Sequence, residues 1–353
     1  MKGRTIILDD IDGIEAAALL VDGQLDDLLI DTPDAPRPGA VYRAICDRPL
    51  KGQGGMMLRL PEGATAFLRS AKGLRPGQPM LVQVTGYADD GKAVPVTDRV
   101  LFKSRFAIVT PGKPGVNVSR QITDDDQRDA LLVLAHAHFD GGDDTGLILR
   151  SSCAYATEDE IAEDIAAMHD LAQAIMAEGE GAEPEALTEG DGPHTLAWRE
   201  WTIPAEVVTE PGGFARQGVL DQIDAIGQPR IPLSEGTMYV EATRALVAVD
   251  VNTGGDTSPA AALKVNLAAA RVLPRALRLR GLGGQIAVDF APMSKAHRKQ
   301  VEQSLRAAFR SDAVETSLVG WTTMGLFELQ RKRERLAWMG LPVRGTSVAG
   351  KRA

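Results

Sequence analysis

Two aspartates, Asp250 and Asp289, are the strongest candidates for chemistry in this 353-residue chain, because each ends an apolar run. The runs cover 245–249 and 284–288, and the stretch between them, roughly 258–280, has helical spacing. This pattern predicts a strand–helix–strand unit with parallel strands. Neighbouring strands lie about 4.8 Å apart. Both aspartates are therefore expected at the carboxyl edge of one sheet, where α/β folds build their sites.

Two carboxylates at that separation repel each other unless a cation lies between them. Mg²⁺ takes one or two protein carboxylates and keeps several waters for a substrate phosphate. Asn252 follows Asp250 by two residues and could orient a carboxylate. Together with the clustered Arg and Lys residues described next, this pattern predicts a magnesium-dependent phosphodiester hydrolase. Asp250, Asn252 and Asp289 are its candidate catalytic residues, with the two aspartates as metal ligands. The alternative is that each aspartate only caps the turn after its strand.

Lysine and arginine are concentrated towards the C-terminus. Residues 264–353 hold 17 Lys+Arg and 6 Asp+Glu, although the whole chain has a net charge of −9. The acidic total argues against indiscriminate binding to nucleic acid or anionic membrane. The local excess predicts a phosphate-binding surface, with a solvated pair of basic helices as the alternative. The candidate phosphate contacts are Arg298, Lys299, Arg331 and Arg333.

The remaining elements position these residues. Strands are expected at Thr5–Leu8, Ala17–Val21 and Leu28–Ile30. Short apolar runs broken by Gly and Pro over 40–97 predict a five-strand barrel of the OB type. Further along, we expect a helix leading to His138, then a strand that ends at Arg150 and Ser151.

An acidic segment separates these elements from the catalytic unit. Residues 157–191 contain 12 acids and no Lys or Arg. The first half, through Met176, has helical spacing, and the second half is expected to be a solvated loop.

Several of these segments together resemble the catalytic region of the ribonuclease E/G family, which are bacterial single-strand RNA endonucleases. The resemblance is densest over 230–335 and rests on VDVNTGG from Val249, the long segment ending IAVDF at Phe290, and MGLFELQRKR from Met324. Weaker resemblance covers VDGQ from Val21, the barrel region from Tyr42, and GLILRS from Gly146.

The resemblance implies a multidomain α/β fold. A ribonuclease-H-like fold is interrupted by an OB-fold barrel and a 5′-sensor region, and is followed by a DNase-I-like subdomain. The expected ranges are 1–36 and a reduced 179–228 for the ribonuclease-H-like parts, 37–98 for the barrel, 99–178 for the sensor region, 229–340 for the catalytic subdomain and 341–353 for a tail.

The resemblance also implies roles for single residues. Asp250 and Asp289 match the family's magnesium-binding aspartates, and Asn252 matches a nearby asparagine that hydrogen-bonds in the site. Arg150 and Ser151 match an Arg-Thr pair that binds a 5′-monophosphate. In the barrel, Phe67 and Lys92 match an aromatic and a basic RNA-contacting position, whereas Met57 stands where the family has a second aromatic.

The chain departs from the family in its cysteines and in its basic residues. It has only Cys46 and Cys153, with no CPxC-type zinc link, so no zinc-linked tetramer is expected and a homodimer is possible. Both cysteines fit buried thiols of a reducing cytoplasm, and no secretory signal or membrane-spanning run is expected. Glu315 and Gly320 stand at positions that are basic or histidine in the family.

The leading hypothesis is therefore a cytoplasmic, magnesium-dependent endoribonuclease that cleaves single-stranded RNA during RNA processing or decay. The alternative is a catalytically inactive RNA-binding paralogue, which Met57, Glu315 and Gly320 favour. A third hypothesis is a protein-interaction subunit that binds its partner through the acidic surface.

Overall fold

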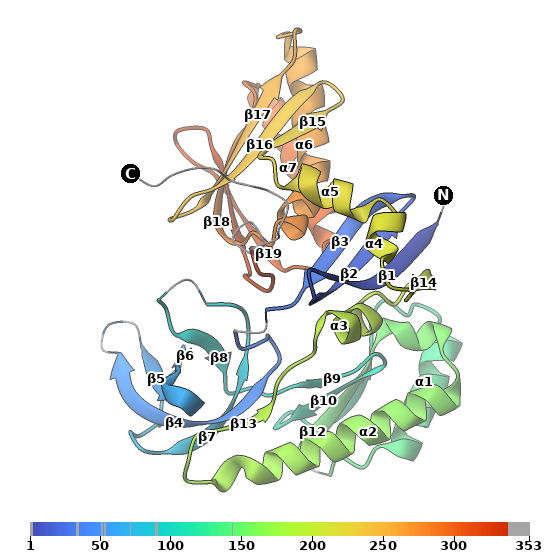
Figure 1. Cartoon of the computed structure of the whole chain (residues 1–353), viewed down its shortest axis with the longest axis vertical. Helices are drawn as coiled ribbons and strands as arrows, with labels where there is room; N and C mark the ends of the chain where they lie inside the picture. The colour runs from blue at the N-terminus through green and yellow to red at the C-terminus, as the bar shows by residue number, and fades with distance from the viewer. Residues whose placement is uncertain are drawn as a thin grey trace. The chain divides into compact units, whose positions relative to one another are not determined.

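The computed structural model describes residues 3–32, 35–50, 52, 54–70, 72–88, 91–142 and 144–337. The chain divides into two compact units, one made of Met1–Thr32 with Ala205–Ala353 and the other of Pro33–Pro204 (Figure 1). The boundary near 204 falls inside the range 179–228 that was expected to form one part.

The first sheet of the discontinuous unit confirms the three strands expected at the N-terminus. It contains β1 (Arg4–Ile11), β2 (Ile14–Val21) and β3 (Gln24–Ile30), with β14 (Glu206–Val208) parallel to β1. Asp-Gly pairs with positive φ make both tight turns, as two-residue hairpin loops require. The short helices α4 (Gly213–Arg216) and α5 (Val219–Ile226) bury their apolar side chains against this sheet.

The second sheet of this unit carries the predicted strand–helix–strand pattern. Its strand order is β15 (Arg230–Leu233), β16 (Gly236–Ala242), β17 (Val247–Thr253), β18 (Gly284–Asp289), β20 (Phe327–Arg331) and β19 (Thr316–Trp321). The helices α6 (Pro259–Leu279) and α7 (Lys295–Arg310) lie along one face (Figure 1). Val249, Val288 and Phe327 are buried under them, while alternate residues such as Asp250 and Asp289 face solvent.

The other unit contains the predicted barrel. Its strands are β4 (Val41–Leu50), β5 (Gly55–Arg59), β6 (Thr65–Leu68), β7 (Pro79–Val84) and β8 (Val94–Thr97), with the 3₁₀ turn η1 (Pro61–Gly63) between β5 and β6. The strand order β4-β5-β6-β8-β7 is closed by pairing between β4 and β7, so the five-strand, OB-like barrel is confirmed.

A second layer of the same unit packs helices on a small sheet. The sheet has the order β11 (Gly115–Val118), β12 (Thr145–Leu149), β10 (Ala107–Pro111), β9 (Phe102–Lys103). The helices α1 (Asp125–His138) and α2 (Glu158–Ala177) share a buried core with it, and η2 (Ser151–Tyr155) joins β12 to α2. The two expected helices and the strand before Arg150 are confirmed.

The acidic segment after Met176 is more ordered than predicted. It contains η3 (Glu178–Glu180), β13 (Glu185–Thr188) and, beyond it, α3 (Pro193–Glu200). The prediction of a solvated loop is wrong over β13, which pairs antiparallel with β4. The buried Arg43 explains this, because its guanidinium binds the Glu178 and Glu183 carbonyl oxygens and the Glu185 carboxylate.

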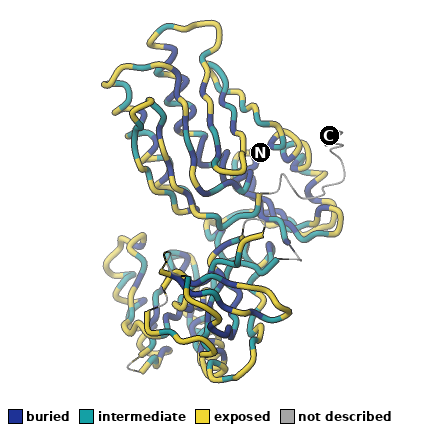
Figure 2. The backbone as a smooth tube through the Cα atoms, turned by 90° about the vertical axis from the view of Figure 1, so that its left-hand side faces the viewer, coloured by how far each residue is buried: buried dark blue, intermediate teal, exposed yellow. Residues whose placement is uncertain are grey.

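The mixed α/β architecture with an OB-like barrel is thus established, while likeness to ribonuclease H and DNase I stays a prediction. Figure 2 shows buried positions in the interior of both units and exposed positions mainly along the outer turns. Within the described ranges, no helix has both the length and the apolar character that crossing a bilayer demands.

Candidate active site

Asp250 and Asp289 come together as predicted. The parallel strands β17 and β18 are neighbours, and these two residues are register partners at their ends. Partners in a parallel pair project to the same face, and both residues are exposed there. The geometry of the predicted pair is confirmed, and its chemical role stays a prediction.

Asn252 is bound to one member of the pair. Its amide Nδ2 donates a hydrogen bond of 2.6 Å to Asp250 Oδ2, which fixes the orientation of that carboxylate. Among the described residues, no group donates a hydrogen bond to the Asp289 carboxylate or forms an ion pair with it. Two neighbouring carboxylates without a protein cation between them are an arrangement that attracts a metal ion.

The donor set fits magnesium better than a metal that needs a full protein cage. No cluster of three or more His, Cys, Asp or Glu side chains suited to a metal occurs in the described part of the chain. Mg²⁺ is commonly held by one or two carboxylates and retains several of its waters, and the two exposed aspartates match that requirement in type and number. That this ion binds here stays a prediction. Zinc sites, in contrast, need three or four protein ligands.

A buried asparagine that sequence reasoning missed anchors the chain just beyond Asp289. Asn266 of α6 is fully buried and makes two hydrogen bonds with the Ala291 backbone. Its Nδ2 donates to the Ala291 carbonyl oxygen at 2.9 Å, and its Oδ1 accepts from the Ala291 N–H at 3.0 Å. A polar residue on the apolar face of a predicted helix was the available signal, since such a group needs a partner.

Arg298 is held beside the same end of β18 by aromatic side chains. Its guanidinium lies 4.7 Å from the ring centroid of Trp321. Trp321 packs in turn against Phe290, the residue after Asp289, with ring centroids 5.9 Å apart. Arg298 has no carboxylate partner among the described residues, and its helical neighbour Lys299 is exposed. Both remain suitable for binding phosphate.

Arg331 does not belong to this surface, which corrects the sequence prediction. It is 1% exposed, and its Nη2 donates to Asp312 Oδ1 at 2.8 Å. The strand β20 alternates between the two faces of the sheet, and Arg331 shares the buried face with Phe327 and Leu329. Arg333 follows the strand, is half-buried, and packs its guanidinium over Gly284.

Arg150 is also engaged inside the protein. Its guanidinium donates to the Glu200 carboxylate at 2.6 Å and to the carbonyl oxygens of Ser104 and Arg199. Ser151 begins η2 directly after it and is half-buried. A 5′-monophosphate at Arg150 would have to displace Glu200 from the guanidinium. The binding of a 5′-monophosphate by Arg150 and Ser151 stays a prediction.

The Glu200 carboxylate lies among three cations. Lys103 and Arg199 approach it at 3.6 Å and 2.7 Å, in addition to Arg150. Burial acts to raise the pKa of Glu200, but the charges of these cations outweigh it and lower the pKa to about 2. Glu200 is thus ionised at neutral pH and forms ion pairs with all three cations. Sequence reasoning missed it because two of its partners, Lys103 and Arg150, are distant along the chain.

The barrel residues are brought together on neighbouring strands. Phe67 on β6 is the register partner of Met57 on β5, and its ring lies over Gly55. Lys92 is exposed in the loop that leads to β8, whose Pro95 is the register partner of Phe67. The predicted barrel contacts therefore share one region, while their role in RNA binding stays a prediction.

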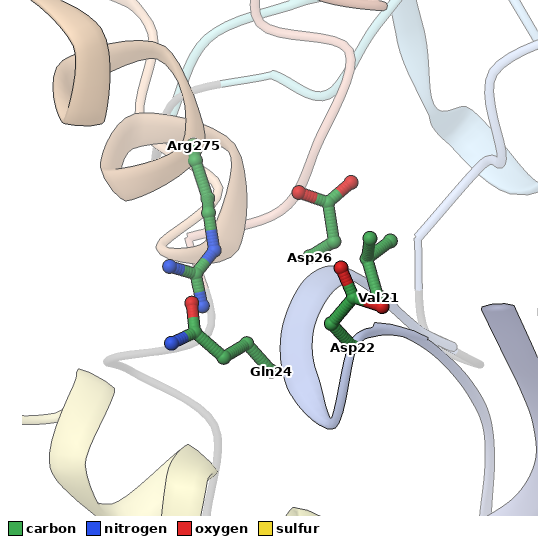
Figure 3. Close-up of a pocket in the computed structure, with 5 residues that line it drawn as sticks. All are labelled: Val21, Asp22, Gln24, Asp26 and Arg275. Carbon is green, nitrogen blue, oxygen red and sulfur yellow. The ribbon is translucent and has the colours of Figure 1, made fainter. Parts of the chain in front are cut away.

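A polar pocket lies at the turn between β2 and β3 and is lined by Val21, Asp22, Gln24, Asp26 and Arg275. Figure 3 shows the Gln24 side chain pointing towards the Arg275 guanidinium. Arg275 Nε donates to the Leu25 carbonyl oxygen at 2.8 Å, so this arginine ties α6 to β3. The pocket contains none of the predicted site residues, and we assign it a structural role.

These features of fold and site define an α/β protein with a paired-carboxylate site and an OB-like barrel. Comparison with known proteins identifies the class. The model of the family described as "Ribonuclease E/G family" matches residues 102–204 and 201–334, and the chain belongs to this family.

Characterised relatives agree with the family match. The chain is 28% identical to ribonuclease G of Escherichia coli K12 over 304 residues, which covers 74% of this chain and 61% of the relative. It is 30% identical to ribonuclease E of Nostoc sp. over 318 residues, covering 78% of this chain and 46% of the relative. Ribonuclease E of Synechocystis sp. is 26% identical, with 88% and 50% covered. The chain thus spans about half to three fifths of the length of these relatives.

Proposed function

We propose that this protein is a magnesium-dependent endoribonuclease that hydrolyses phosphodiester bonds of single-stranded RNA at Asp250 and Asp289. The single observation that carries the proposal is the register pairing of these two exposed carboxylates on adjacent parallel strands. Membership of the ribonuclease E/G family supports the reaction class.

In this proposal Asp250 and Asp289 hold the metal ion, which when bound supplies an activated water and neutralises charge on the scissile phosphate. Asn252 keeps the Asp250 carboxylate in one orientation through its hydrogen bond. Asn266 holds the backbone at Ala291, two residues after Asp289, and so would restrict the position of the Asp289 carboxylate. Rigid support of this kind matters because small displacements of catalytic groups are costly.

Residues other than the two aspartates would bind the RNA. Arg298 and Lys299 would bind backbone phosphates near the site, with Arg333 as a further candidate. On the barrel, Phe67 offers a ring for base stacking and Lys92 a charge, as in other single-strand-binding surfaces. Together these groups would position RNA, while the paired aspartates would act on the phosphodiester.

The proposal is tested with a fluorescent single-stranded RNA of mixed sequence, incubated with the purified protein in Mg²⁺ or in EDTA, beside a fully paired duplex of the same sequence. We expect internal cleavage of the single strand in Mg²⁺ alone, with the duplex cut far more slowly. Binding of the RNA without cleavage in any divalent metal would instead indicate a binding-only paralogue.

A further inference from the structure

An exposed tryptophan stands outside every site described above. Trp198 lies on α3 and is 58% exposed. The helix is anchored by the buried residues Pro193 and Ala197, by Trp201 just after its end, and by the Glu200 ion pairs. Trp198 therefore belongs to a well-anchored helix, and more than half of its surface is exposed to solvent.

One arginine holds the indole ring in place. The Arg105 guanidinium lies 3.9 Å from the Trp198 ring centroid, and its Nη1 donates to the Trp198 carbonyl oxygen. Arg105 thus contacts both the face of the indole ring and the backbone carbonyl of Trp198, and the two contacts together restrict the orientation of the ring. A flat aromatic surface whose orientation is already set loses little entropy when a second planar group stacks on it.

The surroundings of Arg105 add a second exposed ring. The turn η2 ends at Tyr155, which is 69% exposed. This turn is bound to the same segment as the tryptophan, since Ser152 Oγ donates to the Arg105 carbonyl oxygen and Cys153 Sγ to that of Phe106. The partly exposed Lys103 lies at the Glu200 cluster nearby. Exposed aromatic rings accompanied by lysine and arginine are typical of surfaces that bind single-stranded nucleic acid.

We propose that Trp198, braced by Arg105, is a stacking platform for one base of single-stranded RNA. The inference rests on the proposed function, and it adds a contact site on α3 that lies apart from the barrel and the carboxylate pair in the chain. Recognition is through the π-face of a base, so it tolerates any base and requires an unpaired strand. Arg105 is a positioning residue, because it acts through the indole.

The test compares two fluorescent oligonucleotides of about ten nucleotides, a size typical of single-strand sites. One is a 5′-hydroxyl oligouridylate, and the other has the same sugar–phosphate backbone without bases. Affinity is measured by anisotropy in EDTA, where cleavage is silent, for wild type, Trp198→Ala, Trp198→Phe and Arg105→Gln. Val133→Ala, at an apolar position on α1 that is 71% exposed, is the control.

Trp198→Ala is expected to weaken oligouridylate binding by about 5- to 150-fold, the range supplied by one stacked base. It should leave the abasic oligonucleotide unaffected, and Trp198→Phe should retain most of the affinity. Arg105→Gln should weaken oligouridylate binding less than Trp198→Ala does. Val133→Ala should change neither affinity.

Four results would overturn the inference. Unchanged oligouridylate affinity in Trp198→Ala, or an equal loss for both oligonucleotides, would exclude stacking. A change from dimer to monomer in sedimentation velocity would assign Trp198 to a contact between copies of the chain. If wild type binds no RNA at all, the proposed function falls as well, whereas RNA binding with a silent Trp198→Ala removes only the platform.

Discussion

Asp250 lies directly opposite Asp289 across the parallel pair of β17 and β18. Both carboxylates are exposed, and the only hydrogen bond to either within the described ranges comes from Asn252. Removing a charge from such a pair relieves a repulsion of about 1 kcal/mol. We therefore expect a divalent cation bound at this pair to raise the free energy of unfolding.

The first prediction concerns this sensitivity. Without metal, Asp289→Asn should be about 1 kcal/mol more stable than wild type, because the repulsion is gone and the side chain is nearly isosteric. Added Mg²⁺ should stabilise wild type, since it binds the folded state alone, and should leave the variant unchanged. Urea unfolding with and without Mg²⁺ measures both effects. Equal stabilisation of wild type and variant by Mg²⁺ would place the ion elsewhere.

The second prediction concerns Asn266. Asn266→Leu leaves the buried N–H and carbonyl groups of Ala291 without partners, and each such group costs about 1–3 kcal/mol. We expect a loss of about 2–5 kcal/mol in urea unfolding, together with reduced cleavage because the backbone after Asp289 shifts. Asn266→Ala should lower both quantities similarly. A variant as stable and as active as wild type would show that this clamp does not support the site.

The third prediction concerns Arg331 and asks whether this residue stabilises the fold through a buried ion pair or contacts RNA. Arg331→Leu leaves the fully buried Asp312 with a weaker set of partners, and losing one member of such a pair costs about 3–5 kcal/mol. Arg278 also binds Asp312, so the loss should lie at the lower end of this range. The slope of RNA affinity against salt should not change in this variant.

Lys299→Gln is the matched comparison for Arg331, because Lys299 is exposed on α7. It should lower the salt slope by about one unit and leave stability within about 0.5 kcal/mol of wild type. A reversed pattern, in which Arg331→Leu alters the salt slope, would mean that Arg331 reaches RNA in solution.

The fourth prediction follows from the lowered pKa of Glu200. The pKa of about 2 in the folded protein lies below the ordinary glutamate pKa of 4.5, so the ion pairs contribute their full stabilisation above about pH 4.5. This stability is lost as the pH falls from about 4.5 towards 2 and Glu200 is protonated. Glu200→Gln should be less stable than wild type at pH 6, and the difference should shrink steadily at lower pH. Urea unfolding across this range tests it, and a difference independent of pH would exclude the charge as its source.

The aspartate pair and the barrel could be predicted from the sequence because each depends on residue patterns within a short stretch of chain. Each of the two apolar runs ends in an aspartate, so the pattern predicts that each aspartate lies at the end of a strand. A helix between the two strands predicts that they are parallel, and β17 and β18 are. The barrel was predictable for the same reason, since Gly and Pro punctuate its short strands.

Other relationships depend on partners that are distant in the chain. Arg150 and Glu200 are 50 residues apart, and nothing local indicates that they meet. Asn266 and Ala291 meet only because α6 packs at one register on the sheet. The basic run at 331–333 predicts an exposed surface for Arg331, but β20 alternates between the two faces of the sheet and places this residue on the buried one.

The most direct test of the central claim is single-turnover cleavage of single-stranded RNA in Mg²⁺ by wild type, Asp250→Asn and Asp289→Asn. Glu241→Gln, an exposed acid on the neighbouring strand β16, is the control for charge alone. We predict that each aspartate variant lowers the rate by about a hundredfold or more, with RNA affinity in EDTA largely retained, because the several kcal/mol supplied by metal catalysis are lost. Glu241→Gln should cleave like wild type. Cleavage at the wild-type rate in both aspartate variants would contradict the assignment of the active site.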